Sequence, residues 1–156
     1  MRLEEEIKQK QFRNEYHKLG VNILFTSSLL KLKTQQLLKP FGLSPEQFNV
    51  LRILRGQHPD PATVNMIIDR MIDKNSNASR IVDKLVEKKL VTRKESCVDR
   101  RQVDVFINEE GLKMLNEIDM HPDVNFDSTM QWITKDEAQI VNDILDKMRG
   151  PWGTDE

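Results

Sequence analysis

Apolar residues recur at helical intervals through the first 38 residues of the chain. Residues 3–38 contain no proline and a single glycine, Gly20. The apolar positions in this stretch follow a helical spacing of roughly 3.5 residues and are Phe12, Tyr16, Leu19, Ile23, Leu30 and Leu37. The pattern predicts one long helix with an apolar seam, which ends before Pro40.

A second helix start follows the long helix. Ser44 can act as the N-cap, Pro45 suits the first helical position, and Gln47 completes a capping box. The apolar residues that then share one helical face are Phe48, Leu51 and Leu54. We expect this helix to run to about Gly56, because the two prolines in residues 57–62 indicate a connection.

Two further helices are predicted in the middle of the chain. Thr63 can cap a helix of barely two turns, whose inward-facing residues are Val64, Ile67, Ile68 and Met71. Residues 73–76 are typical of a turn that also supplies the next N-cap. A fourth helix then runs to about Lys89, with apolar residues at helical spacing at Ile81, Val82, Leu85 and Val86.

A β-hairpin and two helices complete the pattern. Runs rich in β-branched residues at 90–93 and 103–107 flank the polar residues 94–102, which predicts a two-stranded ribbon with a long charged tip. Asn108 can cap a helix that carries Met114, Leu115 and Ile118. His121-Pro122 then kinks or breaks the chain, and residues 134–137 form a capping box for a last helix. Its apolar residues are Ile140, Ile144, Leu145 and Met148.

The order of these elements predicts a fold class. A short helix, a turn, a second helix with polar outward positions and a basic hairpin together make a winged helix-turn-helix. We expect a mainly α protein with a small β-hairpin wing and long N- and C-terminal dimerisation helices. The expected domains are an N-terminal dimerisation helix at residues 1–41, a winged helix-turn-helix DNA-binding domain at residues 42–108, and C-terminal helices that complete the dimerisation region at residues 109–156.

The charge of the chain is unevenly distributed. The 156 residues carry a net charge of −1, with 38% hydrophobic and 31% charged residues, which is typical of a globular protein. Residues 74–101, however, hold nine basic and four acidic side chains, whereas residues 109–156 hold four basic and twelve acidic ones. A polyanion would therefore be attracted to the middle of the chain and repelled by its C-terminal end.

The chemistry of the basic middle favours DNA as its partner. The start of the fourth helix offers short hydrogen-bonding side chains and cations that can approach base edges and phosphates in a major groove; the candidates are Asn75, Ser76, Asn77, Ser79, Arg80 and Lys84. The hairpin adds cations suited to a narrow minor groove, namely Arg93, Lys94, Arg100 and Arg101. Each residue alone could be only an N-cap or part of a solvated face.

These segments resemble the MarR-type (multiple antibiotic resistance regulator) family of transcription factors. Residues 76–85 look like the family's recognition helix, residues 89–93 like the lead into its wing, and Asp99-Arg100-Arg101 like its wing-tip signature. Glu110-Gly111 matches the start of the following helix. The resemblance implies that Asp99 braces the hairpin through a salt bridge, while Arg100 or Arg101 enters the minor groove.

The resemblance also implies an assembly and a ligand. Members form homodimers through intertwined terminal helices, and small effectors, often aromatic or phenolic, bind between the dimer region and the winged lobes. The residues of this chain do not identify an effector-binding site.

Three positions depart from the family pattern. Lys89 stands where glycine is common, at a left-handed helix-ending position that costs a non-glycine residue roughly 1 kcal/mol. Ile68 replaces a frequent alanine, which affects how closely the two motif helices approach unless the small Ala78 compensates. Asn108 replaces a threonine, and both residues cap helices well.

The terminal helices predict a dimer independently of the resemblance. So small a winged domain cannot bury the seam of a long N-terminal helix, nor the apolar face of the C-terminal helices. We therefore expect a subunit interface that includes Phe12, Ile23, Ile133, Ile140, Ile144 and Met148, with Phe126, Met130 and Trp132 nearby. The alternative is that these residues close a bundle within one chain.

Other functional classes receive little support from the sequence. Cys97 is the only cysteine, so it can form no intrachain disulfide; its basic surroundings would favour a thiolate, but no second cysteine can resolve an oxidised sulfur. His17, His58 and His121 are far apart, and we expect neither a metal site nor a cofactor. No nucleophile motif or phosphate loop indicates an enzyme. The absence of a long apolar run or signal peptide predicts a cytoplasmic protein that does not interact with membranes.

The sequence thus predicts a dimeric regulator that binds a pseudo-palindromic operator in double-stranded DNA. We expect a repressor that a small molecule releases from its operator. The alternative is a winged-helix interaction module that uses its basic wing for a protein partner. Steeply salt-dependent binding to any duplex, with extra affinity for one sequence, would distinguish the two.

Overall fold

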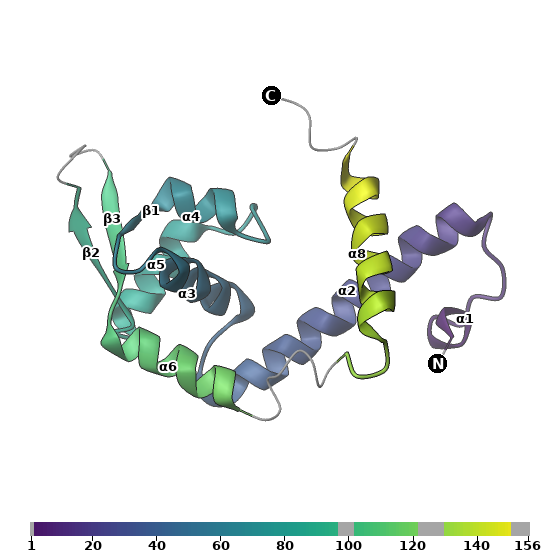
Figure 1. The fold of residues 1–156 in the computed structure, drawn as a ribbon, viewed down its shortest axis with the longest axis horizontal. Coiled ribbons are helices and arrows are strands. Elements are labelled where there is room, and N and C mark those ends of the chain that lie inside the picture. Colours follow the sequence, from purple (N-terminus) through teal and green to yellow (C-terminus); the bar gives the residue numbers. More distant parts are fainter. Residues whose placement is uncertain (1, 97–101, 122–129, 151–156) are drawn as a thin grey trace. The chain divides into compact units, whose positions relative to one another are not determined.

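The structure is a computed structural model that describes residues 2–96, 102–121 and 130–150 (Figure 1). The chain divides into two compact units, Met1–Asp119 and Met120–Glu156. The first unit contains the N-terminal helices and the winged helix-turn-helix. The described part of the second unit consists of the residues that lead into its helix and the helix itself.

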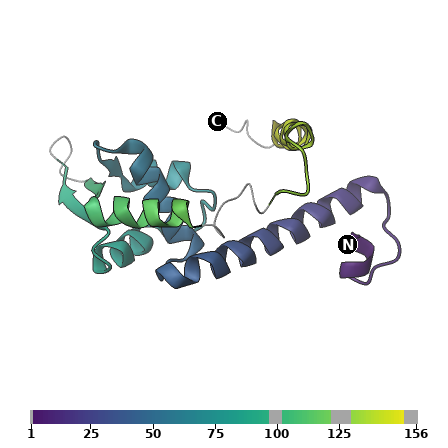
Figure 2. The ribbon, with the colours of Figure 1, turned by 60° about the horizontal axis from the view of Figure 1, so that its bottom comes forward.

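The N-terminal segment forms two helices instead of the single long helix that the sequence predicts. The four-residue helix α1 (Leu3–Glu6) is separated from α2 (Glu15–Leu38) by a connection, which is visible in Figure 2. The prediction of one helix is wrong because Asn14 has an extended backbone and caps α2, its side-chain oxygen accepting a hydrogen bond from the His17 N–H at 2.9 Å. Lys8, with a φ of 54°, also leaves the helical conformation.

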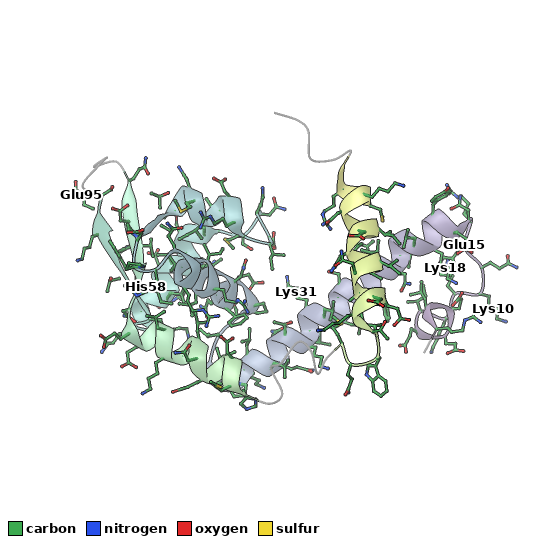
Figure 3. The ribbon with its side chains drawn as sticks, in the orientation of Figure 1. Lys10, Glu15, Lys18, Lys31, His58 and Glu95 are labelled. Carbon is green, nitrogen blue, oxygen red and sulfur yellow. The ribbon has the colours of Figure 1, made fainter. Side chains whose placement is uncertain are left out.

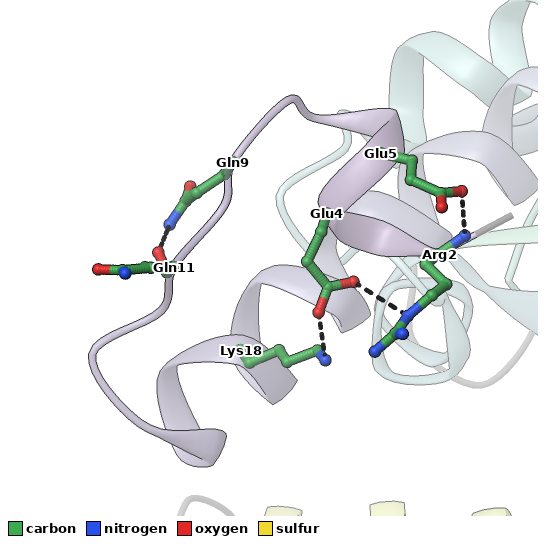
Figure 4. Close-up of polar contacts among 6 residues, drawn as sticks. All are labelled: Arg2, Glu4, Glu5, Gln9, Gln11 and Lys18. Atoms are coloured by element: carbon green, nitrogen blue, oxygen red, sulfur yellow. Dashed lines mark hydrogen bonds and ion pairs between the residues drawn. The ribbon is translucent and has the colours of Figure 1, made fainter.

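The segment before α2 folds back onto the start of that helix. Lys18 of α2 donates a 2.6 Å hydrogen bond to the Glu4 carboxylate, and Arg2 lies 3.8 Å from the other Glu4 oxygen (Figure 4). The Lys18 hydrogen bond holds the pKa of Glu4 below its usual value. The Phe12 ring packs edge-on against His17, with ring centroids 5.7 Å apart. Phe12 therefore has a partner within its own chain.

The helix α3 begins where the sequence predicts. After the 3₁₀ turn η1 (Lys39–Phe41), Gly42 adopts a left-handed φ of 65° and turns the chain into α3 (Pro45–Gln57). Ser44 and Gln47 form the expected capping box. The buried face of α3 consists of Phe48, Val50, Leu51 and Leu54.

The helix-turn-helix itself is formed by α4 (Val64–Arg70) and α5 (Ala78–Glu87). Thr63 caps α4 as predicted, by accepting a hydrogen bond from the Met66 N–H at 3.2 Å. The sequence does not predict the two-residue strand β1 (Ala62–Thr63), which pairs with the hairpin and leaves Ala62 fully buried. So short a strand has no pattern of its own and forms through pairing with its neighbour.

The predicted hairpin is present and belongs to a three-stranded antiparallel sheet of order β1-β3-β2. Strand β2 (Val91–Glu95) pairs with β3 (Val103–Ile107) in a register that places Arg93 opposite Val105. The helix α6 (Glu109–Met120) follows and ends directly before His121-Pro122. The core is formed mainly by fully buried side chains of α3, α4, α5, β3 and α6, which include Leu51, Ile67, Leu85, Val105, Leu115 and Ile118.

The second unit contains α8 (Lys135–Arg149), which starts at the predicted capping box. Thr134 accepts a hydrogen bond from the Glu137 N–H, and the Glu137 carboxylate accepts one from the Thr134 N–H. None of the α8 side chains is buried. Among the described residues, no helix is both long enough and apolar enough to cross a membrane.

Candidate nucleic-acid interface

The exposed surface of α5 carries the predicted recognition residues. Ala78, Val82 and Leu85 are buried against the core. The opposite side of the helix exposes Ser79, Arg80 and Lys84. Because residues four apart lie on the same face of a helix, Arg80 and Lys84 project together. The face that points away from the core is therefore polar and basic.

The N-cap of α5 is Asn77, one residue beyond the turn in which the sequence places it. Its side-chain oxygen accepts a hydrogen bond from the Arg80 N–H at 3.0 Å. This capping bond occupies the oxygen, whereas the amide nitrogen has no hydrogen-bond partner within the described residues and can donate to another molecule. Ser76, predicted to start the helix, is half-buried before it.

The turn before α5 is held in place by hydrogen bonds that its backbone N–H groups donate. Asp73 accepts hydrogen bonds from the Ser76 N–H through its carbonyl, at 3.2 Å, and from the Asn75 N–H through its side chain, at 3.1 Å. The Ile72 N–H donates to the Asn49 side chain of α3. Asn75 is exposed on this ordered turn, next to the start of the recognition helix.

The wing residue Arg93 contacts the recognition helix. Its guanidinium forms an ion pair with Asp83 of α5, and both side chains are about half exposed. Asp83 therefore braces the root of the wing, a role that the sequence does not reveal because it depends on how β2 lies against α5. The predicted bracing residue, Asp99, lies outside the described residues.

Lys94 projects from the other face of the wing. Successive side chains of a strand point to opposite faces, so Arg93 and Lys94 do not share a surface, although the sequence groups them. The Lys94 ammonium lies 5.6 Å from the centre of the Phe106 ring, and Asp104 is opposite it in register. Lys94 is exposed, so its ammonium can also contact a phosphate.

The tip of the wing lies outside the described residues. Strand β2 ends at Glu95, which is labelled in Figure 3, and β3 begins at Val103. The predicted contacts of Arg100 and Arg101, and the thiol of Cys97, fall between these strands and are not described by the structure. Phe126, which belongs to the second unit, also lies outside the described residues.

Lys84 and Lys88 interact with groups of the chain itself. The Lys84 ammonium lies 2.8 Å from the Glu87 carboxylate, with both side chains exposed. Lys88, which caps the C-terminal end of α5, donates a 2.7 Å hydrogen bond to the Gly42 carbonyl. The exposed Lys84–Glu87 ion pair contributes only about 0–1 kcal/mol, so Lys84 can exchange its carboxylate partner for a phosphate.

The chain joins α5 to β2 in the left-handed conformation that the family pattern suggests. Lys89 has a φ of 59°, although it is not a glycine. The Asn108 amide donates to the Lys89 carbonyl at 2.8 Å, and the Asn108 side-chain oxygen accepts from the Gly111 N–H at 2.9 Å. Asn108 thus caps α6 as predicted and also holds the strained residue in place.

Gly111 is a structural residue whose role the sequence does not predict. A Cβ atom at this position would lie 2.3 Å from the Leu90 carbonyl oxygen and 2.7 Å from a side-chain carbon of Ile107. The close approach of α6 to the root of the wing therefore requires glycine. Only the match of Glu110-Gly111 to a family pattern could have indicated this.

The predicted dimer residues lie on surfaces that the single chain leaves largely open. Ile140 and Ile144 of α8 are 57% and 48% exposed. On α2, Tyr16 of the predicted seam and Leu24, which is not among the residues predicted for that seam, are 85% and 73% exposed. Ile133 is also exposed, whereas Ile23 and Met148 are partly covered. Within the described parts of the chain, no group of three or more histidine, cysteine, aspartate or glutamate side chains could hold a metal ion.

Comparison with known proteins connects this geometry to a family. A sequence model of the MarR family matches residues 41–102. The HTH-type transcriptional regulator MhqR of Bacillus subtilis is 29% identical over 107 residues, which is 69% of this chain and 72% of the relative. YpoP, an uncharacterised HTH-type transcriptional regulator of the same organism, is 30% identical over 106 residues, or 68% and 74% of the two chains.

Solved structures share the fold over most of the chain. The Staphylococcus aureus MepR–DNA complex matches with a TM-score of 0.74 at 22% identity, covering 88% of this chain and 97% of MepR. The organohalide-sensing regulator RdhR-CbdbA1625, solved with 2,4-dichlorophenol bound, matches with a TM-score of 0.76 at 20% identity, covering 90% and 85%. The predicted fold class, mainly α with a winged helix-turn-helix, is confirmed.

Proposed function

Because this chain belongs to the MarR family of transcriptional regulators, we propose that it binds a pseudo-palindromic operator as a homodimer and represses transcription until a small molecule releases it. The relatives are transcription regulators, which favours DNA over a protein as the partner of the basic surface. We assign the chain no enzymatic activity and place it in the cytoplasm, where an operator is accessible.

The polar and basic face of α5 carries this proposal. Ser79, Arg80 and Lys84 are exposed on one helix, and the helix begins at the Asn77 amide. Arg80 has no carboxylate partner within the described residues, so its guanidinium is available to a guanine edge or a phosphate. Asn75, Ser76 and Asn77 complete the proposed recognition site at the N-terminal end of α5, where backbone N–H groups also favour phosphate.

The wing supplies a second set of contacts in this proposal. Lys94 contributes an ammonium on the outer face of the hairpin, and Arg100 and Arg101 at the tip are the minor-groove candidates. Arg93 has a mixed role, because its ion pair with Asp83 fixes the wing root before any DNA is bound. Asp99 keeps its proposed bracing role at the tip.

The dimer rests on the exposed apolar surfaces of both units. Solvent-exposed isoleucine, leucine and tyrosine side chains on α2 and α8 favour burial in a subunit interface. The proposed interface residues are Phe12, Ile23, Ile133, Ile140, Ile144 and Met148. A two-fold axis would place two recognition helices in successive major grooves, about 10 base pairs apart. Residues 1–41 and 109–156 would then form the dimerisation region around the DNA-binding residues 42–108.

An aromatic or phenolic effector is proposed by analogy with a structural relative. RdhR-CbdbA1625 senses organohalides and has been solved with 2,4-dichlorophenol. A phenol that binds one spacing of the recognition helices better than another would shift the population away from the DNA-binding form.

Selection of genomic DNA fragments bound by the purified protein tests the proposal. The selected operator should contain an inverted repeat, and its affinity should exceed that of random duplex by at least about a thousandfold. The affinity of both duplexes should fall steeply with salt. Arg80→Ala should reduce the ratio of the affinity for the operator to the affinity for random DNA. Lys94→Ala should lower the affinity for both duplexes by the same factor. Equal binding of all fragments at every salt concentration would contradict the proposal.

A further inference from the structure

Lys88 forms a long-range contact where the winged lobe, defined here as α3 to β3, meets the N-terminal helices. Its ammonium donates a 2.7 Å hydrogen bond to the carbonyl of Gly42, 46 residues away. Lys88 lies at the C-terminal end of α5, and Gly42 is the residue that ends η1, which continues directly from α2. The contact therefore ties the end of the recognition helix to the end of α2.

Arg55 forms a second long-range polar contact, where the winged lobe meets α6. Its guanidinium lies 2.6 Å from the Asp119 carboxylate, with the side chains 28% and 43% exposed. Arg55 belongs to the last turn of α3, and Asp119 is the last residue of the first compact unit. The chain continues from this point into the second unit.

The two polar contacts can fix the orientation of the winged lobe relative to its flanking helices, whereas apolar packing only holds these parts together. Leu38 and Leu43 are buried on either side of η1, and Ile118 is buried beside Asp119. Burial of such side chains is non-directional and tolerates small rotations. Hydrogen bonds weaken steeply when their angle changes, so the two polar contacts restrict how the lobe can turn about its flanking helices.

We propose that Lys88 and Arg55 are positioning residues for operator recognition, which set the half-site spacing that the dimer accepts. This inference rests on the proposed function. A small rotation between the lobe and α2 produces a large displacement at the far end of α2. This helix has 24 residues and therefore measures about 36 Å. A rotation of about 5° at its base moves its far end by about 3 Å, close to the roughly 3.4 Å between successive base pairs.

Operators with altered spacing test this inference. The probes are the operator selected with the wild-type protein and duplexes with one or two base pairs inserted or removed between its half-sites. The wild type should lose affinity by about tenfold or more on the altered duplexes. We define the spacing ratio as the affinity for the selected operator divided by the affinity for a duplex with altered spacing. Lys88→Met, Arg55→Met and Asp119→Asn should each reduce this ratio several-fold. Base substitutions within a half-site should lower the affinity of these variants as much as that of the wild type.

Charge effects are separated by matched variants. Arg55→Met removes a positive charge and Asp119→Asn removes a negative one, yet both break the same ion pair and should lower the spacing ratio by a similar factor. Lys113→Met removes a positive charge from the exposed side of α6 and should leave the ratio unchanged. Exchanging the partners, Arg55→Asp with Asp119→Arg, should restore it. Thermal melting of each variant verifies that the lobe is folded.

The outcomes distinguish this inference from the proposed function. Wild-type ratios retained by the Lys88, Arg55 and Asp119 variants would overturn the positioning role. Shifts of opposite sign for Arg55→Met and Asp119→Asn would do the same, because they would reveal a charge effect. A wild-type protein with no operator or no spacing preference would instead contradict the proposed dimeric regulator, before any variant is measured.

Discussion

Asp83 of α5 and Arg93 of the wing form an ion pair that joins the two elements proposed to contact DNA. Asp83 thereby puts a carboxylate on the surface proposed to approach a polyanion. A negative charge at this place opposes phosphate binding in general. The ion pair with Arg93 fixes the position of the wing, which offsets this electrostatic cost if the wing position contributes to specific recognition.

Asp83→Asn should therefore separate specific from nonspecific binding. The variant loses one negative charge, so its affinity for random duplex should rise. The wing loses its anchor, so the ratio between operator and random DNA should fall by about tenfold, which corresponds to a single base contact of roughly 1–3 kcal/mol. Fluorescence anisotropy on both duplexes at fixed salt measures the ratio.

Glu87→Gln is the matched control for this experiment. It removes the same charge from the same helix and frees Lys84 rather than Arg93. Random-duplex affinity should rise as in Asp83→Asn, but the specificity ratio should stay near the wild-type value. Equal ratios for the two variants would refute the bracing role of Asp83.

Lys89→Gly should stabilise the protein. Lys89 has a φ of 59°, and a non-glycine residue in this conformation costs about 1 kcal/mol or slightly more. The greater freedom of glycine in the unfolded chain offsets part of the gain, so the free energy of unfolding should rise by roughly 0.5 kcal/mol. Urea titration measures the change.

Lys89→Ala is the control, because it removes the same charge but keeps a Cβ atom in the left-handed conformation. Its free energy of unfolding should not rise. A stabilisation equal to that of Lys89→Gly would mean that charge, and not backbone strain, limits stability at this position.

Gly111→Ala should destabilise the junction between α6 and the wing. The added Cβ would lie 2.3 Å from the Leu90 carbonyl oxygen, a backbone atom that cannot move without the strand. Overpacking of this kind costs about 1–3 kcal/mol, and the loss should be visible in thermal melting. In Gly56→Ala, by contrast, the new methyl group meets no atom within 4 Å, and the variant should be stabilised by up to about 1 kcal/mol. A neutral Gly111→Ala would contradict the packing described for α6.

Local signals in the sequence predict most helix starts correctly. The capping boxes at Ser44 and Thr134 each depend on residues only three positions apart, so the sequence contains all the information that they need. The hairpin follows equally from two β-branched runs on either side of a polar stretch. The prediction of one long N-terminal helix is wrong because helical periodicity extends across Asn14, whose capping bond starts a new helix.

Contacts that depend on tertiary placement are not predictable in this way. The ion pair of Arg93 with Asp83 requires the packing of β2 on α5, and the split of Arg93 and Lys94 between two faces of the wing requires its register. Strand β1 exists only because Ala62 pairs with Val105. Helical spacing alone does separate the buried and exposed faces of α5, so the sequence predicts that Ser79, Arg80 and Lys84 are exposed; their contacts with DNA stay a prediction.

Acidification should weaken the start of α8 through Glu137. Hydrogen bonds from the Thr134 N–H and hydroxyl hold the pKa of Glu137 below its usual value of 4.5. A lowered pKa in the folded state adds stability that is present above pH 4.5 and is lost as the pH falls through the folded-state pKa. Circular dichroism from pH 7 to pH 3 should follow this loss in the wild type. Glu137→Gln does not titrate at this position, so the difference between the two proteins should change only in the acidic range. A constant difference throughout would contradict the capping assignment.

An exposed isoleucine of α8 offers a test of the dimer. Ile144 is 48% exposed on α8 of the single chain, and a proposed interface residue at this position would be buried in the assembly. Ile144→Asp would then bury an unpaired charge and should shift the protein from dimer to monomer at micromolar concentration in light scattering. Operator affinity should fall to that of a single half-site, although no DNA-contacting residue has changed. Asn142→Asp adds the same charge two residues away, on the other side of the helix, and should leave the dimer intact. Two outcomes would contradict the proposal that α8 forms part of a dimer interface. One is a wild-type protein that is monomeric, and the other is an Ile144→Asp variant that stays dimeric and binds the full operator tightly.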